Sequence, residues 1–155
     1  MLQILEATSS FQIRQVQSLF QEYAISRNFD AALQDFEQEL KNLPGKYAAP
    51  KGTLLLATWK DMEVGCVAFQ SLSNTICEMK RMYVKPDHRR KGIGKALIQR
   101  LMELAKGREY KIMRLDTHPS MLVAHQLYAQ FGFQEIERYN ENPIKGIRFF
   151  ECLIE

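Results

Sequence analysis

The first part of the chain carries apolar side chains at helical spacing. From residue 9 to residue 24, one helical face would hold Ile13, Val16, Phe20 and Ala24. Ser9 and Gln12 have the spacing of a capping box, in which each side chain bonds the backbone N–H of the other residue. A second helix is expected with Asp30 as its N-cap and Leu43-Pro44-Gly45 as its end, and its apolar side consists of Leu33, Phe36 and Leu40. Residues 46–52 are expected to form a loop.

From residue 53 the pattern changes to one typical of β-strands. Segments 53–59, 64–71 and 75–84 are rich in strand-forming residues, and turn-like breaks at 60–63 and 73–74 separate them. Because breaks this short favour hairpins, we expect these strands to form an antiparallel meander.

The strongest helical pattern covers residues 92–106, with an apolar stripe made by Ile93, Ala96, Leu97, Leu101 and Leu104. Gly107 is expected to follow the helix as its C′ residue. A short strand over residues 111–116 comes next, so the unit from Thr75 to Asp116 is predicted to be strand, helix and strand. Such a crossover makes its two strands parallel.

The last part of the chain predicts one more helix and two strands. Ser120 is expected to cap the helix and Gly132 to end it, and one side carries Met121, Ala124, Leu127, Tyr128 and Phe131. Segments 133–139 and 147–153 are predicted to be strands. The element order is thus ααβββαβαββ, an α/β (α+β) fold in which helices cover both faces of a mixed, mostly antiparallel central sheet. No repeat or linker interrupts residues 1–155, which indicates one domain.

Composition narrows the class of protein. With 155 residues, 46% of them hydrophobic and 25% charged, the chain suits a folded domain and excludes disordered and fibrous classes. A net charge of +3 is far from that of a dedicated nucleic-acid binder. The start lacks the pattern of a secretory signal, and no apolar run is long enough to cross a membrane. Cys66, Cys77 and Cys152 form no C-x-x-C pair, so we expect reduced thiols, no bound metal and a cytoplasmic location.

Candidate chemistry lies where the strand ending at Val84 leads into the helix from Gly92. Four cationic side chains crowd this turn: Arg89, Arg90, Lys91 and Lys95. A helix N-terminus offers free N–H groups and positive potential to an anion, and glycine allows close approach of the backbone. The alternative is a solvated basic loop. A P-loop is excluded because Ala96 follows Lys95, and a dinucleotide fingerprint is excluded because Leu97 stands where the third glycine belongs.

Two segments carry a family resemblance. Arg89-Arg90-Lys91-Gly92-Ile93-Gly94 follows a strand ending Met82-Tyr83-Val84 and resembles the R-x-x-G-x-G/A acetyl-CoA signature of the GNAT superfamily. Residues 124–133 are similar to its A-x-x-L-Y-x-x-x-G-F segment, and the element order matches along the whole chain. The resemblance implies an N-acetyltransferase that moves an acetyl group from acetyl-CoA directly to a primary amine of a small molecule or peptide.

The same resemblance implies where the cofactor lies. The two central strands would splay apart, and backbone groups of Met82, Tyr83 and Val84 would bond the pantetheine arm. The pyrophosphate would lie over the loop and helix start, formed by Arg89, Arg90, Lys91, Gly92, Ile93, Gly94 and Lys95. Met121 departs from the family, because many relatives have an asparagine there that contacts the cofactor.

Glu78 and Tyr128 are the expected catalytic residues. Glu78 lies six residues before Val84, at the position of the general base in well-known members, and its apolar neighbours Cys77 and Met79 predict partial burial. The alternative for Glu78 is an ion pair with Lys80 or Arg81. Tyr128 resembles the general acid that protonates the leaving thiolate, and its alternative is a core aromatic residue. Many family members deprotonate the amine through water, so a direct role for Glu78 is left open.

The acceptor is less constrained. By analogy, its walls come from the helices of residues 10–43 and the segment 139–146, and three arginines are candidates to pair with an acceptor carboxylate: Arg27, Arg138 and Arg148. No catalytic role is expected for His88, His118 or His125, and His125 is expected on a solvated helix face. We expect neither nucleic acid nor membrane as partner, and a homodimer is left open. The rival hypothesis is a catalytically degenerate CoA-sensing or phosphate-binding module.

Overall fold

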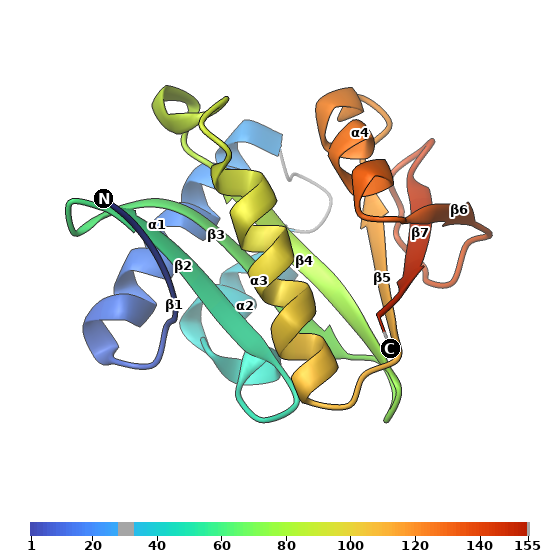
Figure 1. The fold of residues 1–155 in the computed structure, drawn as a ribbon, viewed down its shortest axis with the longest axis horizontal. Helices are drawn as coiled ribbons and strands as arrows, with labels where there is room; N and C mark the ends of the chain where they lie inside the picture. The colour runs from blue at the N-terminus through green and yellow to red at the C-terminus, as the bar shows by residue number, and fades with distance from the viewer. Residues whose placement is uncertain (28–32, 155) are drawn as a thin grey trace.

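A seven-stranded mixed sheet forms the centre of the molecule (Figure 1). The computed structural model describes residues 1–27 and 33–154. The strands lie in the order β1-β2-β3-β4-β5-β7-β6. Their bounds are β1 Leu2–Glu6, β2 Thr53–Trp59, β3 Met62–Ser71, β4 Ile76–Val84, β5 Ile112–Thr117, β6 Gln134–Ile136 and β7 Arg148–Leu153. The helices are α1 Ser10–Arg27, α2 Leu33–Lys41, α3 Ile93–Gly107 and α4 Leu122–Gln130, with short 3₁₀ turns at Gly45–Tyr47 and Pro86–His88.

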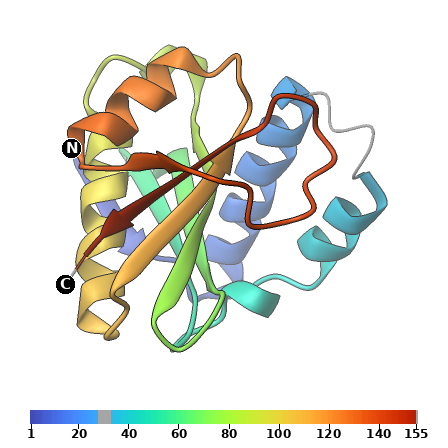
Figure 2. The same ribbon diagram turned by 90° about the vertical axis from the view of Figure 1, so that its right-hand side faces the viewer.

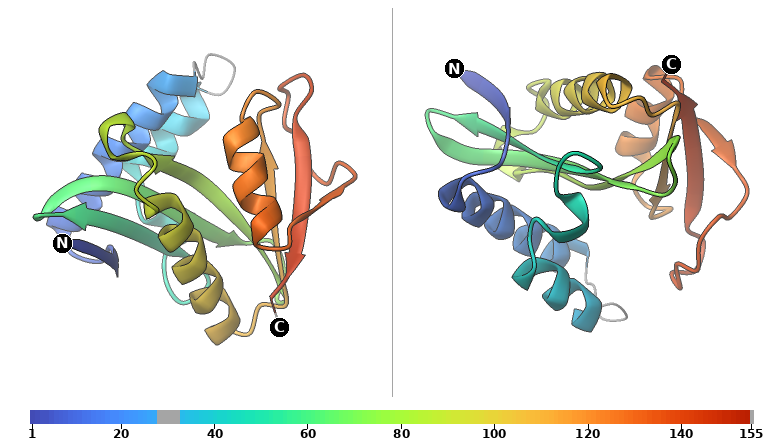
Figure 3. Two further views of the ribbon diagram at one scale, coloured as in Figure 1. Left: turned by 45° about the horizontal axis from the view of Figure 1, so that its top comes forward. Right: turned by 90° about the horizontal axis from the view of Figure 1, so that it is seen from below.

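Helices cover both faces of the sheet, as expected (Figure 3). Because strand residues alternate, Leu54 and Leu56 of β2 pack under α1, whereas Leu55 and Ala57 pack under α3. The α1 side of the core adds Val16, Leu19 and Phe20, and the α3 side adds Leu97, Leu101 and Tyr128. The meander from β2 to β4 is antiparallel, and β4 and β5 are parallel neighbours on either side of the α3 crossover. The predicted fold class is confirmed.

The first strand was not predicted. Residues Leu2–Glu6 pair antiparallel with β2 at the edge of the sheet, so the element order is βααβββαβαββ. The five-residue strand has little intrinsic signal of its own, and its place follows from packing: Leu2 and Ile4 lie against the core on the α3 side. Arg108, just after α3, also bonds Glu6 at 2.7 Å and ties this edge to the helix.

The predicted helix ends are partly right. The capping box is confirmed: the N–H of Gln12 donates to Ser9 Oγ at 3.1 Å, and the N–H of Ser9 donates to Gln12 Oε1 at 3.1 Å. Asp30 lies outside the described residues. Ser120 does not cap α4, because its hydroxyl bonds His118 Nδ1 at 2.7 Å and Met121 takes the N-cap position without a side-chain bond. Gly107 is the last residue of α3 rather than its C′ residue, since the helix continues until Arg108 caps it.

The three cysteines are buried free thiols. In the described part of the chain, no helix combines the length and apolar character needed to cross a membrane.

Candidate active site

The two central parallel strands separate beyond their first residues. Among the described residues, β4 and β5 are paired at three positions, and the last of these joins Glu78 to Arg114. Beyond that point β4 continues to Val84 and β5 to Thr117, and the two strands diverge in a V (Figure 3, left). Backbone groups along the inner edges of the V are therefore available to an extended ligand.

A β-bulge in β4 accompanies this divergence. Cys66 of β3 lies opposite Tyr83, whereas Ala68 lies opposite Lys80, so two residues of β4, Arg81 and Met82, face one residue of β3. Arg81 has a positive φ of 60°, an unusual backbone conformation for a residue with a side chain. Bulges bend a strand and increase its twist, which moves the end of β4 away from β5.

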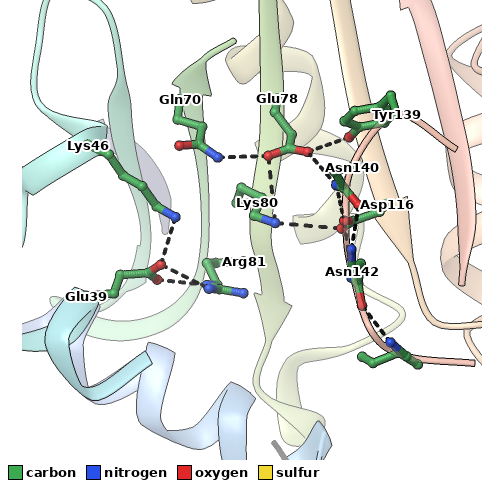
Figure 4. A network of polar contacts seen from close by, with 11 residues as sticks. Glu39, Lys46, Gln70, Glu78, Lys80, Arg81, Asp116, Tyr139, Asn140 and Asn142 are labelled. Atoms are coloured by element: carbon green, nitrogen blue, oxygen red, sulfur yellow. Dashed lines mark hydrogen bonds and ion pairs between the residues drawn. The ribbon is translucent and has the colours of Figure 1, made fainter. Parts of the chain in front are cut away.

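The side chain of Arg81 fixes the bulge to α2. Its guanidinium donates to both carboxylate oxygens of Glu39, at 2.8 and 2.9 Å, and Lys46 lies 3.1 Å from the same carboxylate (Figure 4). Burial alone would raise the pKa of Glu39, but the hydrogen bonds and charge of Arg81 lower it below the ordinary value. Glu39 is therefore a carboxylate, and the pair holds the acceptor side of β4 in place.

A narrow pocket of about 90 Å³ lies within the V. We call it the splay pocket. Its walls include Met79, Lys80, Arg81 and Met82 of β4, Leu115, Asp116 and Thr117 of β5, and Tyr128 of α4. Met121, where relatives often have asparagine, lines the same pocket. The predicted cofactor-contact residue Met82 is thus in the gap, while Tyr83 points its side chain toward α1 and donates to Glu22 at 3.2 Å.

The predicted phosphate loop leads from β4 into α3. Gly92 is the N-cap of α3 with a left-handed φ of 79°, and the next three N–H groups begin the helix. Arg89 donates through Nε to the carbonyl of Val84 at 2.9 Å, which fixes the loop to the strand end. In the described part of the chain, Arg89, Arg90, Lys91 and Lys95 form no ion pair. A helix N-terminus with unpaired cations around it fits a polyphosphate ligand.

Gly94 lies where α3 approaches β4. A Cβ atom at this position would lie 2.8 Å from Met82 Cε and 3.5 Å from a methyl group of Leu127. Glycine therefore keeps the helix start close to the mouth of the splay pocket. At Gly92 the space is open, so the positive φ is what favours glycine there.

A larger pocket of about 840 Å³ adjoins the splay pocket, and we call it the acceptor pocket. Residues from α1, α2, the 3₁₀ turn at Gly45–Tyr47, β4, β5 and the segment 140–144 form its wall. Figure 2 shows the segment between β6 and β7 crossing toward α1, which closes this side. The segments that were expected to wall the acceptor therefore line one pocket, and the binding of an acceptor there stays a prediction.

Glu78 is buried within a polar network (Figure 4). It is 3% exposed and accepts hydrogen bonds from Gln70 at 2.8 Å, Tyr139 at 2.5 Å and Asn140 at 3.5 Å. The predicted contact with Lys80 is present at 3.7 Å, and Lys80 lies equally far from Asp116. The predicted burial of Glu78 is confirmed, and the ion-pair alternative describes a contact that the residue does make.

Asp116 connects this network to both pockets. It accepts hydrogen bonds from Asn140 at 2.8 Å and from Asn142 at 3.2 Å, and it lines the acceptor pocket and the splay pocket. Burial would raise its pKa, but the charge of Lys80 and the two amide bonds lower it. Asn140 and Asn142 lie in the segment that was expected to wall the acceptor, whereas Asp116 was not predicted as a site residue. The sequence did offer one indication of its role, because Asp116 ends the predicted strand of residues 111–116, next to the expected gap between the central strands.

Tyr128 is 5% exposed and lines the splay pocket from α4. Burial raises the pKa of its phenol, so the hydroxyl keeps its proton at neutral pH. Its ring also packs against Phe133, with centroids 5.8 Å apart. Tyr128 is therefore a core aromatic residue, and it also brings a protonated hydroxyl to the wall of the splay pocket. The structure is compatible with both alternatives that the sequence left open.

The other predicted polar residues have structural partners. His125 is buried rather than solvated, because α4 packs its ring on Phe150 and against Arg148 Nη1 at 3.2 Å. Arg148 also pairs with Glu135 at 2.8 Å, and Arg138 donates to the carbonyl oxygens of Asn140 and Asn142. His118 lines both pockets. Within residues 1–27 and 33–154, no three His, Cys, Asp or Glu side chains are grouped as metal ligands.

Comparisons with known proteins identify the family. A sheet that opens between two parallel strands, beside a basic helix start, is the arrangement that the resemblance to the GNAT superfamily implied. A family model described as an acetyltransferase (GNAT) domain matches residues 50–135. An N-acetyltransferase of Schizosaccharomyces pombe without an assigned substrate is 36% identical over 83% of this chain and 80% of its own length. The chain belongs to the GNAT acetyltransferase family, and it is an N-acetyltransferase enzyme.

Solved structures agree with this fold. A GNAT-family acetyltransferase from Staphylococcus aureus has a TM-score of 0.84 at 21% identity, and the match covers 100% of each chain. A putative acetyltransferase from Salmonella typhimurium, solved with acetyl-CoA as its cofactor, has a TM-score of 0.78 at 15% identity over 99% of this chain and 94% of that chain.

Proposed function

We propose that this enzyme moves an acetyl group from acetyl-CoA directly to the primary amine of a small molecule or peptide. The observation that carries the proposal is the open V between β4 and β5, which leads from the acceptor pocket to the unpaired cations at the start of α3. An extended ligand with a polyphosphate end fits that course, and an amine fits the acceptor side.

The chain's residues would hold acetyl-CoA in two places. Backbone groups of Met82, Tyr83 and Val84 would bond the arm of the cofactor, and the segment from Arg89 to Lys95 would bind its pyrophosphate. Acetyl-CoA supplies an activated acetyl group. In the transfer the amine nitrogen gains the acetyl carbon and loses a proton, and the departing sulfur takes up a proton, so the products are an amide and a free thiol.

Glu78 is the proposed destination of the amine proton. Residues of its network, Lys80, Asp116 and Asn140, line the acceptor pocket, whereas its own carboxylate lies behind them. A water molecule between the amine and this network is the simplest path for the proton. We therefore favour a water-mediated role for Glu78 over direct contact.

Tyr128 is the proposed proton donor to the sulfur. Its buried phenol is protonated, faces the splay pocket and is close to where the end of the arm would lie.

A panel of amines assayed for free CoA release tests the proposal. The panel should include amino acids, polyamines, an aminoglycoside and peptides with free N-termini, and mass spectrometry should confirm the acetylated product. We expect one class to raise CoA release well above hydrolysis by water. If acetyl-CoA binds but every amine leaves CoA release at the level of hydrolysis, the protein is a CoA-sensing module and not a transferase for these acceptors.

A further inference from the structure

Arg27, the last residue of α1, lies where the two pockets meet. It lines both the acceptor pocket and the splay pocket. Its Nη1 atom is buried and has no hydrogen-bond partner among the described residues. A guanidinium stays charged at physiological pH, so a buried N–H group without an acceptor is unfavourable. A carboxylate bound beside Arg27 would satisfy this donor.

The other cations of the acceptor pocket already have acidic partners. Arg81 and Lys46 share Glu39, with contacts of 2.8 and 3.1 Å. Lys80 lies between Glu78 and Asp116, at 3.7 Å from each. Arg27 appears in no ion pair of the described residues, so it differs from every other cation of this wall.

The remaining arginine candidates from the sequence are also engaged. Arg138 donates to two backbone carbonyl oxygens, and Arg148 forms a two-point contact with Glu135 at 2.8 and 2.9 Å. Of the three arginines that the sequence offered for an acceptor carboxylate, Arg27 alone lines the acceptor pocket in the described structure.

A negative group lies in the same wall. Asp116 lines both pockets, as Arg27 does, and its hydrogen bonds from Asn140 and Asn142 hold it as a carboxylate. The junction of the two pockets therefore offers an unpaired cation from α1 and an anion from β5. A molecule with opposite charges a few bonds apart matches this arrangement.

We propose that the acceptor is an amino acid, whose carboxylate binds Arg27 while its amine lies on the Asp116 side near the splay pocket. Charge-assisted contacts from an arginine to a carboxylate are strong and directional, and they would orient the amine toward the acetyl group. This inference rests on the proposed function, because the bound amine is the group that receives the acetyl.

Polycationic acceptors fit the same wall poorly. A polyamine or an aminoglycoside would bring further positive charge beside Arg27 and Lys80. The buried carboxylate Glu39 is already shared by Arg81 and Lys46, and the other acids of the wall, Asp35 and Glu141, are exposed. An exposed carboxylate offers weak, screened attraction, so it does not compensate for the repulsion.

Calorimetry on the CoA-saturated enzyme tests the carboxylate site without turnover. Each standard amino acid is titrated, and each one that binds is compared with its primary amide and its decarboxylated amine. We expect at least one amino acid to bind about 10- to 100-fold more tightly than its amide, the range for hydrogen bonds between charged groups. Arg27→Gln should remove this difference and Arg27→Lys should restore part of it, while circular dichroism shows that both variants stay folded.

Arg14→Gln is the matched control, because Arg14 is an exposed arginine of the same helix that lines neither pocket. Three results would overturn the inference. They are equal affinity for an amino acid and its amide, equal affinity of the Arg27→Gln variant and the unchanged enzyme for the amino acid, and no binding of any amino acid. The CoA-release assay separates it from the proposed function. Arg27-dependent binding of an amino acid without CoA release would support the carboxylate site and contradict the transferase proposal. CoA release only with amines that lack a carboxylate would support the transferase proposal and contradict the carboxylate site.

Discussion

The two ends of the site use positive charge in opposite ways. At the start of α3, four cations that are near neighbours in the sequence face solvent without acidic partners in the described structure. In the acceptor pocket, Lys46, Lys80 and Arg81 are held by acids that come from α2, β4 and β5. Unpaired positive charge attracts any highly charged anion. Positive charge that is paired with a buried acid instead holds the side chains of the pocket wall in fixed positions.

From this difference we infer that one end binds the cofactor through charge alone and that the other end selects the acceptor. The cofactor end needs only a glycine-rich helix start and local cations, since a polyphosphate supplies most of the complementary charge. The acceptor end would have to distinguish amines, and Lys46, Lys80 and Arg81 are fixed there in ion pairs. Arg27 Nη1 has no partner among the described residues, and we propose that it meets the ligand. Substitutions at the cofactor end should therefore reduce acetyl-CoA affinity, and substitutions at the acceptor end should reduce turnover or acceptor selectivity.

Gly94→Val should have the largest effect, because it fills the junction between α3 and β4. Its Cβ would lie 2.8 Å from Cε of Met82, a residue that lines the splay pocket, so the Met82 side chain would have to change position where the cofactor arm is proposed to bind. We expect acetyl-CoA binding measured by calorimetry to be lost while circular dichroism shows a folded domain. Gly107 is the last residue of the same helix, and a Cβ there would meet no atom within 4 Å, so Gly107→Val should bind acetyl-CoA normally. Gly92→Val should also abolish binding, but through the strain of its positive φ. Undiminished acetyl-CoA affinity in folded Gly94→Val would contradict the binding of the cofactor at this loop.

Glu78→Gln should lower turnover by about 10²- to 10⁴-fold, the range for a positioned general base. Gln keeps the size of the side chain, and Glu78 lines neither pocket, so acetyl-CoA affinity should change little. The loss should be smaller at high pH, where more of the acceptor amine is already neutral. Pre-steady-state rates across pH measure this.

Glu151→Gln is a suitable control for Glu78. It makes the same change in the same sheet, on a residue that pairs with Arg114 at 3.0 Å and lines neither pocket. Normal turnover in Glu78→Gln at every pH would leave deprotonation to water or to the substrate, and the buried network would then be structural.

Tyr128→Phe should slow the reaction by about 10²-fold, the lower end of general-acid effects, because it removes the proton donor and keeps the ring packing. Stability should change little. Tyr110→Phe is the contrasting variant: Tyr110 is equally buried, at 5% exposed, and its hydroxyl donates to the carbonyl of Lys51 at 2.6 Å. That variant should lose about 1 kcal/mol of stability with normal turnover. The opposite pattern would make Tyr128 a core residue only.

The cofactor end was accessible from the sequence because its residues are contiguous. Local spacing alone placed the strand end at Val84, the glycines and the cations on one turn. The acceptor network was not accessible, since Asp116 meets Asn140 and Asn142 only after β5 and the segment before β7 come together. Lys80-Arg81-Met82 also lacks a glycine, so nothing in its composition predicts the positive φ and bulge at Arg81. Strand β1 was missed for a related reason, because its pairing with β2 is long-range.

Arg90→Ala should have the smallest effect and is the sharpest test of unpaired charge. Arg90 is exposed and makes no ion pair in the described structure, so its loss should weaken acetyl-CoA binding by about 2- to 5-fold, equivalent to about 0.5–1 kcal/mol. The effect should shrink at high salt, and a CoA analogue without phosphates should bind both forms alike. Arg89→Ala should weaken binding more than Arg90→Ala, for acetyl-CoA and for the analogue, because Arg89 Nε also donates to the carbonyl of Val84 at 2.9 Å and fixes the loop. Arg100→Ala, on the exposed side of α3, should change neither affinity. Equal losses for CoA and the analogue in Arg90→Ala would mean that this arginine supports the loop and does not contact phosphate.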